Sequence, residues 1–367
     1  MNGNQRWQLF FILPNLSLRA ETPFASDYVC ICSADDERMQ SLTDSPGDRT
    51  GARMVTTFRT WFGTPYTPSC LLVRADAPAV YRNAEVLRAF RNLCAIPTTT
   101  HAAARFFDRA QWLPGYSDFF FFAAYMPGMS GRILTVDGMV LGTDHRVNAF
   151  AGQCAGQIAA PQHFTVLHDR GLFVRLLKAW KSYYVLHPRD FELLPLFRSL
   201  EVAFQAGRYP SDGLSSINDV GTRIGLWVSA FEVLFHPGHR GRVNKHLVQT
   251  ELSRFTFYQP NLRRRSYSYN WNGKHRTNFA GMIYDDMYRA RNDFMHGNPV
   301  RVQDLRLRRA RRFPPLLDVA PILYNIGLRA YTKSMFALSR RQQVEDSVHG
   351  AMTLSRALTT IQRHNEE

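Results

Sequence analysis

The sequence predicts an α+β protein in which an N-terminal mixed α/β domain precedes an all-α helical bundle. Short apolar segments of strand-like composition gather in the first part of the chain. The second part consists of amphipathic segments whose apolar residues recur at helical spacing. The chain has 367 residues, a length that favours two domains. We place one domain at residues 1–165 and the other at residues 166–367.

Five segments of the N-terminal domain are expected to be strands: 7–18, 27–36, 69–76, 117–125 and 132–142. The last is expected to be a hairpin that turns at Asp137-Gly138, since Asp-Gly is a preferred two-residue turn. Residues 84–96 carry apolar side chains at helical spacing and are expected to be a helix. Segments 41–53 and 142–163 are polar or interrupted by Gly and Pro, and we expect loops there.

Six longer helices are expected in the second domain: 168–186, 190–207, 216–238, 243–258, 276–296 and 316–340. A short helix is expected near the C-terminus. Most connections are short, except for the loops expected at 257–275 and 297–313. Helices joined in this way are typical of a helical bundle.

The sequence gives no sign of a membrane protein. No apolar run reaches the roughly 18 residues that a membrane span needs. The N-terminal segment lacks a small-residue cleavage site and soon reaches Pro14, so we interpret it as the first strand and not as a signal peptide. We therefore expect a cytoplasmic protein.

Five cysteines, all in the first half, are expected to be reduced core residues: Cys30, Cys32, Cys70, Cys94 and Cys154. The alternative is a metal site. It is disfavoured because no Cys-x-x-Cys pair exists and no His cluster completes a zinc spacing. We expect Cys30 and Cys32 to lie on opposite faces of one strand.

The net charge of +15 is concentrated in one stretch. Residues 1–200 hold 20 basic and 16 acidic residues, whereas residues 236–312 alone hold 17 and 5. A local positive field suits a polyanion such as nucleic acid. The alternative is a coding bias, since only 5 of the 45 basic residues are Lys. Such a bias explains the choice of Arg but not the scarcity of acids here.

The segment 279–299 holds the candidate catalytic residues. A strong helix stop follows His296, with Gly297 as a candidate left-handed cap and then Pro299. Asn292 and His296 are four residues apart on one helix face, and Arg291 is adjacent. Arg can grip phosphate oxygens, and His can move a proton at a 2′-hydroxyl or at a leaving oxygen. The alternative is a surface Arg beside a helix-capping His.

This string, from Tyr288 to Gly297, resembles the signature of the HEPN superfamily and is closest to its Apea-like branch. The resemblance covers about residues 166–340. The upstream segment WVSAFEVLF also resembles a core motif of that branch. The resemblance implies that the two helices pack together and that Glu232 orients Arg291. The alternative for Glu232 is a partly buried acid paired with any nearby Arg.

The resemblance also implies a homodimer in which two Arg/His sets face one another across one RNA cleft. We expect no cofactor and no catalytic metal. No carboxylate cluster for Mg²⁺ is evident, and Asp285-Asp286 is a weak candidate. One departure from the family is Asn298, which stands where some HEPN toxins carry a modifiable Tyr. Control by modification is therefore not expected.

Two basic runs near this helix are expected to bind RNA. They comprise Arg263, Arg264 and Arg265, and Arg306, Arg308, Arg309, Arg311 and Arg312. Tyr267, Tyr269 and Trp271 follow the first run at period two, a pattern that suits base stacking beside a phosphate-binding patch. The alternative is a hairpin tip or loop with solvated Arg side chains.

The expected function is a metal-independent endoribonuclease of the HEPN type that acts through 2′-hydroxyl attack, as a toxin or a phage-defence effector. The main alternative is a non-catalytic module that binds RNA or a partner. A DNA-directed nuclease ranks last, since no carboxylate metal site is evident. The sequence identifies no RNA target, activating signal, regulatory partner or antitoxin, and no role for residues 1–165.

Overall fold

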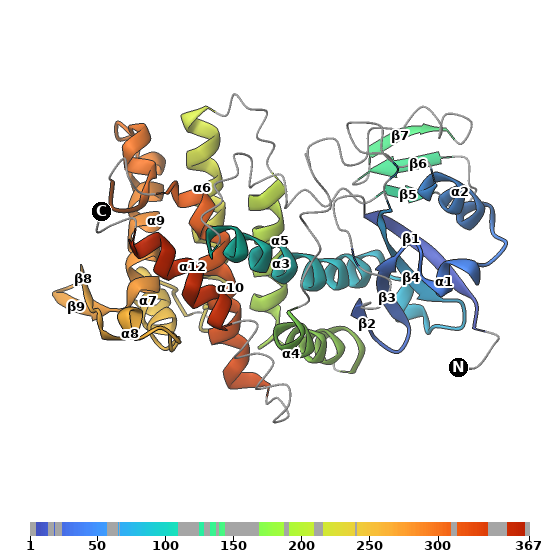
Figure 1. Cartoon of the computed structure of the whole chain (residues 1–367), viewed down its shortest axis with the longest axis horizontal. Helices are drawn as coiled ribbons and strands as arrows, with labels where there is room; N and C mark the ends of the chain where they lie inside the picture. The colour runs from blue at the N-terminus through green and yellow to red at the C-terminus, as the bar shows by residue number, and fades with distance from the viewer. Residues whose placement is uncertain are drawn as a thin grey trace. The chain divides into compact units, whose positions relative to one another are not determined.

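The structure is a computed structural model that describes residues 5–13, 18, 24–56, 65, 67–108, 125–127, 133–136, 139–143, 169–186, 191–208, 216–238, 241–309, 314–336 and 351–363. The chain divides into two compact units (Figure 1). Residues 1–95 and 121–168 form the first, and residues 96–120 and 169–367 form the second. The predicted α+β class is confirmed, because the main sheet belongs to the first unit and a helical bundle to the second.

The first unit contains a seven-stranded antiparallel sheet in the order β2-β3-β4-β1-β5-β6-β7. Its strands are β1 (Trp7–Leu13), β2 (Phe24–Ala25), β3 (Val29–Ser33), β4 (Ser69–Arg74), β5 (Tyr125–Pro127), β6 (Ile133–Val136) and β7 (Met139–Thr143). Strands β6 and β7 pair through Val136 and Met139, as expected of the predicted hairpin. Its turn at 137–138 lies outside the described residues. So do residues 144–163 of a predicted loop and most of the predicted strand 117–125.

The cysteines on β3 correct one prediction. Cys30 and Cys32 lie on the same face, because side chains two residues apart on a strand point the same way. Both pack with Cys70 and Leu72 of β4 in one apolar cluster, and Cys32 is the direct cross-strand partner of Cys70. The four cysteines described, Cys94 included, are buried free thiols, while Cys154 lies outside the described residues.

The first unit also holds α1 (Glu37–Gln40), α2 (Pro46–Val55) and the 3-10 turn η1 (Ala79–Arg82). The long helix α3 (Ala84–Asp108) begins in this unit and continues into the second after residue 95. The prediction of a loop at 41–53 is wrong, because α2 occupies much of this segment. Ser45 caps this helix by accepting from the Asp48 N–H, and Pro46 takes a first-turn position that favours proline. The buried Asp48 carboxylate also accepts from the Leu9 N–H of β1, which fixes α2 beside the sheet.

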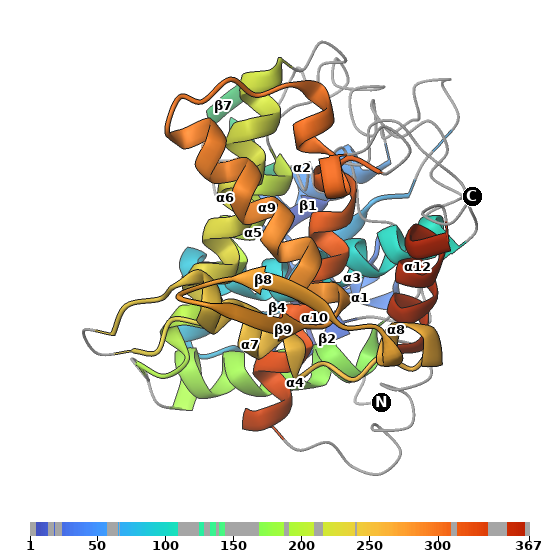
Figure 2. The same cartoon turned by 90° about the vertical axis from the view of Figure 1, so that its left-hand side faces the viewer.

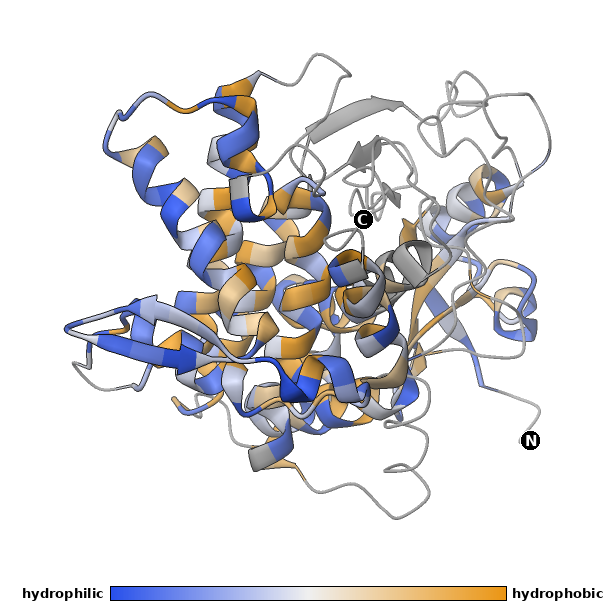
Figure 3. Ribbon diagram, turned by 60° about the vertical axis from the view of Figure 1, so that its left-hand side comes forward, coloured by the Kyte–Doolittle hydropathy of each residue, from blue (hydrophilic) through white to orange (hydrophobic). Residues whose placement is uncertain are grey.

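The second unit is a bundle whose apolar helix faces point inward (Figure 3). Its helices are α4 (Arg170–Trp180), the π-helical segment η5 (Lys181–Leu186), α5 (Leu194–Arg208), α6 (Ile217–Leu234), α7 (Lys245–Ser253), α8 (Pro260–Arg264), α9 (Phe279–Met295), α10 (Leu316–Met335) and α12 (Met352–Arg363). The 3-10 turns η6 (Val302–Leu305) and η7 (Leu307–Arg309) lie within the predicted loop 297–313.

A hairpin replaces much of the loop predicted at 257–275. After α8, strands β8 (Tyr267–Asn270) and β9 (Lys274–Thr277) pair antiparallel. Asn272 and Gly273 have positive φ angles of 47° and 127°, which make the tight turn between them. The hairpin lies against α7 and α9 (Figure 2). Helix α9 begins at Phe279 and not near 276, because β9 uses the preceding residues.

Aromatic side chains lock α6, α9 and α10 together. Phe231 of α6 makes edge-to-face contacts with Tyr284 of α9 and Tyr324 of α10, with centroid separations of 5.4 and 5.6 Å. Ser199 of α5 donates to the Ala230 carbonyl at 2.6 Å and hydrogen bonds with the Tyr324 hydroxyl. The Phe231–Tyr284 contact holds α6 against α9, and the hydrogen bonds of Ser199 join α5, α6 and α10.

Across the described ranges, no helix combines the length and the apolar character that spanning a membrane requires.

Candidate functional site

Helix α9 ends where its sequence predicts, although it begins three residues later than expected. Asn278 caps its start by accepting from the Gly281 N–H. His296 is the C-cap, and Gly297 follows with a φ of 71°, the left-handed conformation that favours glycine. In the last turn, Phe294 packs on Gly221 of α6. The end of α9 is therefore held on α6 while the cap itself is exposed.

Arg291 lies on the side of α9 that faces α6. One terminal nitrogen is 3.9 Å from a Glu232 carboxylate oxygen, and the other donates to the Asn292 Oδ1 at 3.0 Å. The guanidinium carbon is 5.8 Å from the Tyr288 ring centroid. The side chain is 28% exposed, so it is held on several sides and still reaches solvent. Helices α6 and α9 thus pack together, as the family resemblance implies.

Glu232 lies largely buried beneath Arg291. Burial raises the pKa of its carboxyl group, and the nearby Arg291 charge opposes that rise. The Tyr284 hydroxyl is buried in the same region and has no hydrogen-bond partner among the described residues. Burial raises the pKa of Tyr284, and the Glu232 charge adds to that rise. The ionised carboxylate thus depends on Arg291 as its counter-charge.

His296 stands apart from this group. Its residue is exposed, and its backbone N–H donates to the Asn292 carbonyl at 3.0 Å. Within the described part of the chain, its imidazole makes no hydrogen bond or ion pair. Five positions on a helix correspond to about 140° around the axis, so Arg291 and His296 project in different directions. One chain brings Arg291, Asn292 and Glu232 together but does not join His296 to them.

This arrangement offers two kinds of chemistry at one helix end. A partly exposed guanidinium, oriented by a carboxylate and an amide, suits the non-bridging oxygens of a phosphodiester. An exposed imidazole at the end of a helix is accessible for proton transfer to or from a bound substrate. The two groups serve one phosphodiester only if a second element brings them together.

The first basic run is accessible. Arg263, Arg264 and Arg265 are exposed at and just after the end of α8. Of the aromatics that follow, Tyr269 is only 5% exposed and hydrogen bonds with His246 through its hydroxyl at 2.7 Å. Tyr269 is therefore not free to stack on a base. The stacking predicted from period two fails there, because this face of β8 turns toward the bundle.

The second basic run is only partly described. Arg308 is exposed and adopts a left-handed φ of 53°, and its backbone N–H donates to the Asp286 carboxylate at 2.7 Å. Arg306 is half-buried. The side chains of Arg309, Arg311 and Arg312 lie outside the described residues.

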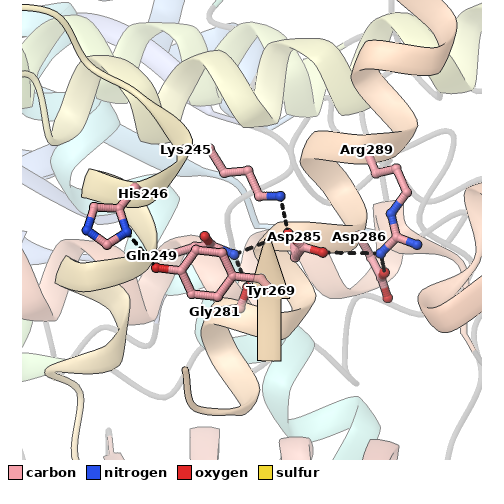
Figure 4. A network of polar contacts seen from close by, with 8 residues as sticks. All are labelled: Lys245, His246, Gln249, Tyr269, Gly281, Asp285, Asp286 and Arg289. Atoms are coloured by element: carbon pink, nitrogen blue, oxygen red, sulfur yellow. Dashed lines mark hydrogen bonds and ion pairs between the residues drawn. The ribbon is translucent and has the colours of Figure 1, made fainter. Parts of the chain in front are cut away.

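The adjacent acids Asp285 and Asp286 form ion pairs with basic side chains (Figure 4). Asp285 pairs with Lys245 and with Arg289, and Asp286 accepts from Arg289 at 2.5 Å. Gln249 donates to Asp285 at 3.3 Å. These contacts explain the two carboxylates without a magnesium ion. In the described ranges, no group of three or more His, Cys, Asp or Glu side chains is arranged to hold a metal.

Sequence reasoning missed a groove beside the site. It has a volume of about 560 Å³ and is lined by Lys245, by residues 268–270 of β8 and by α9 side chains that include Tyr288 and Asn292. Tyr288 was named only as the first residue of the HEPN-like string, although it lies three positions before Arg291 and is therefore its neighbour on the helix surface. The groove itself depends on the hairpin, which was predicted as a loop.

In comparisons with known proteins, no family model, no curated protein and no solved structure matches the chain.

Proposed function

We propose that this protein is a metal-independent endoribonuclease that acts as a homodimer through Arg291, Asn292 and His296. The 2′-oxygen of RNA attacks the adjacent phosphorus, the bond to the 5′-oxygen breaks, and a 2′,3′-cyclic phosphate and a 5′-hydroxyl result. His296 transfers a proton at the attacking or the leaving oxygen, and Arg291 stabilises the charge on the non-bridging oxygens. Glu232 is a positioning residue that holds Arg291.

One observation carries this proposal: a partly exposed Arg291 is held by Glu232 and Asn292 on the helix that ends in an exposed His296. Residues 236–312, which include α9, hold many more basic than acidic side chains. This local positive charge supports an RNA substrate. The resemblance to HEPN ribonucleases supports the same reaction. A role as a toxin or phage-defence effector is part of the proposal.

Cleavage of labelled RNA in the presence of EDTA tests the proposal. We expect cyclic-phosphate ends, no cleavage of matched DNA, and a loss of at least about 100-fold in Arg291→Ala and His296→Ala. Arg254→Ala is a matched control, because it changes an exposed arginine that follows α7 and pairs with Glu251. Circular dichroism confirms that each variant folds. If EDTA abolishes cleavage, or if both site variants stay active, the mechanism is wrong.

A second candidate is a non-catalytic RNA-binding module. The angular separation of Arg291 and His296 within one chain favours it, since a single copy does not assemble the site. In that case the protein binds RNA without cleaving it, and Arg291→Ala weakens binding whereas His296→Ala does not. Binding and cleavage measured on the same RNA separate the two candidates.

A further inference from the structure

The groove between the hairpin and α9 has a composition unlike that of a phosphate site. Its charged side chains are Lys245, Arg289, Asp285 and Asp293, whose formal charges cancel. Asp285 is already paired with both cations. A cavity of about 560 Å³ with no net charge has the size of a small-molecule pocket but no excess charge to attract a phosphate. Its lining suits a neutral polar group.

The hairpin wall of the groove carries uncommitted polar groups. Ser268 and Asn270 alternate with the buried Tyr269 on β8, and both are exposed. Their side chains make no hydrogen bond with any residue that the structure describes. A hydroxyl and an amide offer both donors and acceptors, which is what recognition of a base edge requires.

The opposite wall connects the groove to the proposed reaction site. Asn292 lines the groove and accepts the hydrogen bond from Arg291. The Tyr288 ring lines the groove, and its centroid is 5.7 Å from the Lys245 ammonium and 5.8 Å from the Arg291 guanidinium. An aromatic ring of the groove is therefore a direct neighbour of the proposed phosphate-binding Arg, and an unpaired base could stack on it.

We propose that this groove is a nucleobase-specificity subsite, which holds one unpaired base of a single-stranded RNA next to the scissile phosphate. The inference rests on the proposed function for its placement relative to the phosphate. Ser268 and Asn270 read the base edge, Tyr288 stacks on the base, and Arg291 holds the adjoining phosphate. The protein then discriminates among the four bases through the hairpin, and the exposed Arg263 and Arg264 bind the strand without regard to sequence.

The test uses the full chain and fluorescein-labelled pentanucleotides of A, C, G or U that carry 2′-fluoro groups and so cannot be cleaved through 2′-hydroxyl attack. Fluorescence anisotropy gives the four dissociation constants. For the unmodified protein, we expect the tightest and weakest to differ by about tenfold or more. In Ser268→Ala/Asn270→Ala we expect the spread to shrink to within about threefold. Both side chains are exposed, so the variant should fold.

Two further variants give the contrast. Ser266→Ala, also exposed and just outside the groove, should keep the full spread. Arg263→Ala/Arg264→Ala should weaken binding of all four strands by a similar factor. If the Ser268→Ala/Asn270→Ala variant keeps the spread of the unmodified protein, the subsite is not where we place it. The same holds if the unmodified protein shows no spread.

Nucleoside 5′-monophosphates form a second arm, because a base can also arrive in a free nucleotide. They lack the neighbouring nucleotides of a strand, and we expect them to bind at least about tenfold more weakly than the preferred pentanucleotide. Equal affinity would assign the groove to free nucleotides and overturn the RNA assignment. The two proposals fail separately: base preference without cleavage refutes only the nuclease, and cleavage without hairpin-dependent preference refutes only the subsite.

Discussion

Glu232 shows how one buried acid can orient a cation. Its carboxyl group is desolvated, which raises its pKa, and the Arg291 charge partly restores the ionised form. The separation of 3.9 Å is at the upper limit of an ion pair, so the contact orients more than it stabilises. The Glu232 charge therefore holds Arg291 in position, and the burial of that charge lowers the free energy of unfolding.

Glu232→Gln should separate these two effects. A carboxyl whose folded pKa is raised gives stability that is complete below its unfolded pKa and is lost as pH rises through the folded pKa. The Gln variant lacks this loss. We therefore subtract the unfolding free energy of the unmodified protein from that of the Gln variant at each pH. We expect this difference to be larger at pH 8 than at pH 4.5, by up to about 1 kcal/mol.

Urea unfolding at both pH values measures this difference, and RNA cleavage at pH 8 should fall at least about tenfold in the same variant. Glu251→Gln, in the ion pair with Arg254 on α7, is the control and should leave cleavage unchanged. If the Glu232→Gln variant has a lower unfolding free energy than the unmodified protein at pH 8 and still cleaves RNA at the full rate, the positioning role is contradicted.

At the scale of elements, α6 carries two glycines on the face toward α9, and their surroundings differ. A Cβ at Gly221 would collide with the Phe294 ring, whereas a Cβ at Gly225 would meet its nearest neighbour, the Arg291 Cγ, at 3.9 Å. Position 221 therefore has no room for a methyl group, whereas position 225 can accept one. Close approach of α6 to the last turn of α9 therefore depends on Gly221.

Gly221→Ala and Gly225→Ala form a matched pair. Alanine gains up to about 1 kcal/mol in a helix interior relative to glycine. At Gly225 we expect that gain in unfolding free energy, whereas at Gly221 overpacking should reverse it and leave a net loss of about 1 kcal/mol. Thermal or urea unfolding of both variants checks this. Equal gains at both positions would show that Phe294 moves aside freely.

Local chemistry made some elements predictable. Helix α6 starts at Ser216 with a capping box to Asp219, and α9 stops at His296-Gly297, because caps and left-handed glycines act over a few residues. Helix α2 was missed although Ser45, Pro46 and Asp48 form a similar start signal, since its polar sequence was read as a loop. The β8–β9 hairpin was missed because its strands are polar outside and buried only against α7 and α9.

At the scale of the molecule, the sequence predicted which residues share the end of α9 but not the directions in which they point. Arg291, Asn292 and Glu232 meet because α6 and α9 pack through Phe231 and Tyr284, a long-range contact that only the resemblance implied. The separation of His296 from Arg291 follows from helix geometry alone. The groove could not be predicted, because three separate segments form it.

That separation leads to a prediction about assembly. If two copies complete one site, the Arg291 of one chain acts with the His296 of the other. We expect sedimentation velocity to give twice the chain mass of 42.2 kDa. Arg291→Ala and His296→Ala dimers, each inactive alone, should recover cleavage when mixed under conditions that exchange subunits, because a mixed dimer holds one intact Arg and one intact His in trans. Recovery of up to about a quarter of full activity is expected if half of the dimers are mixed and each has one of two working pairs.

Two controls decide how the mixture is read. Two different affinity tags show whether mixed dimers form, and the double variant Arg291→Ala/His296→Ala mixed with either single variant should recover nothing. Mixed dimers that form but stay inactive would mean that Arg291 and His296 act within one chain or not at all. Recovery would instead explain how Arg291 and His296, five positions and therefore about 140° apart around an ideal helix, can still serve one phosphodiester.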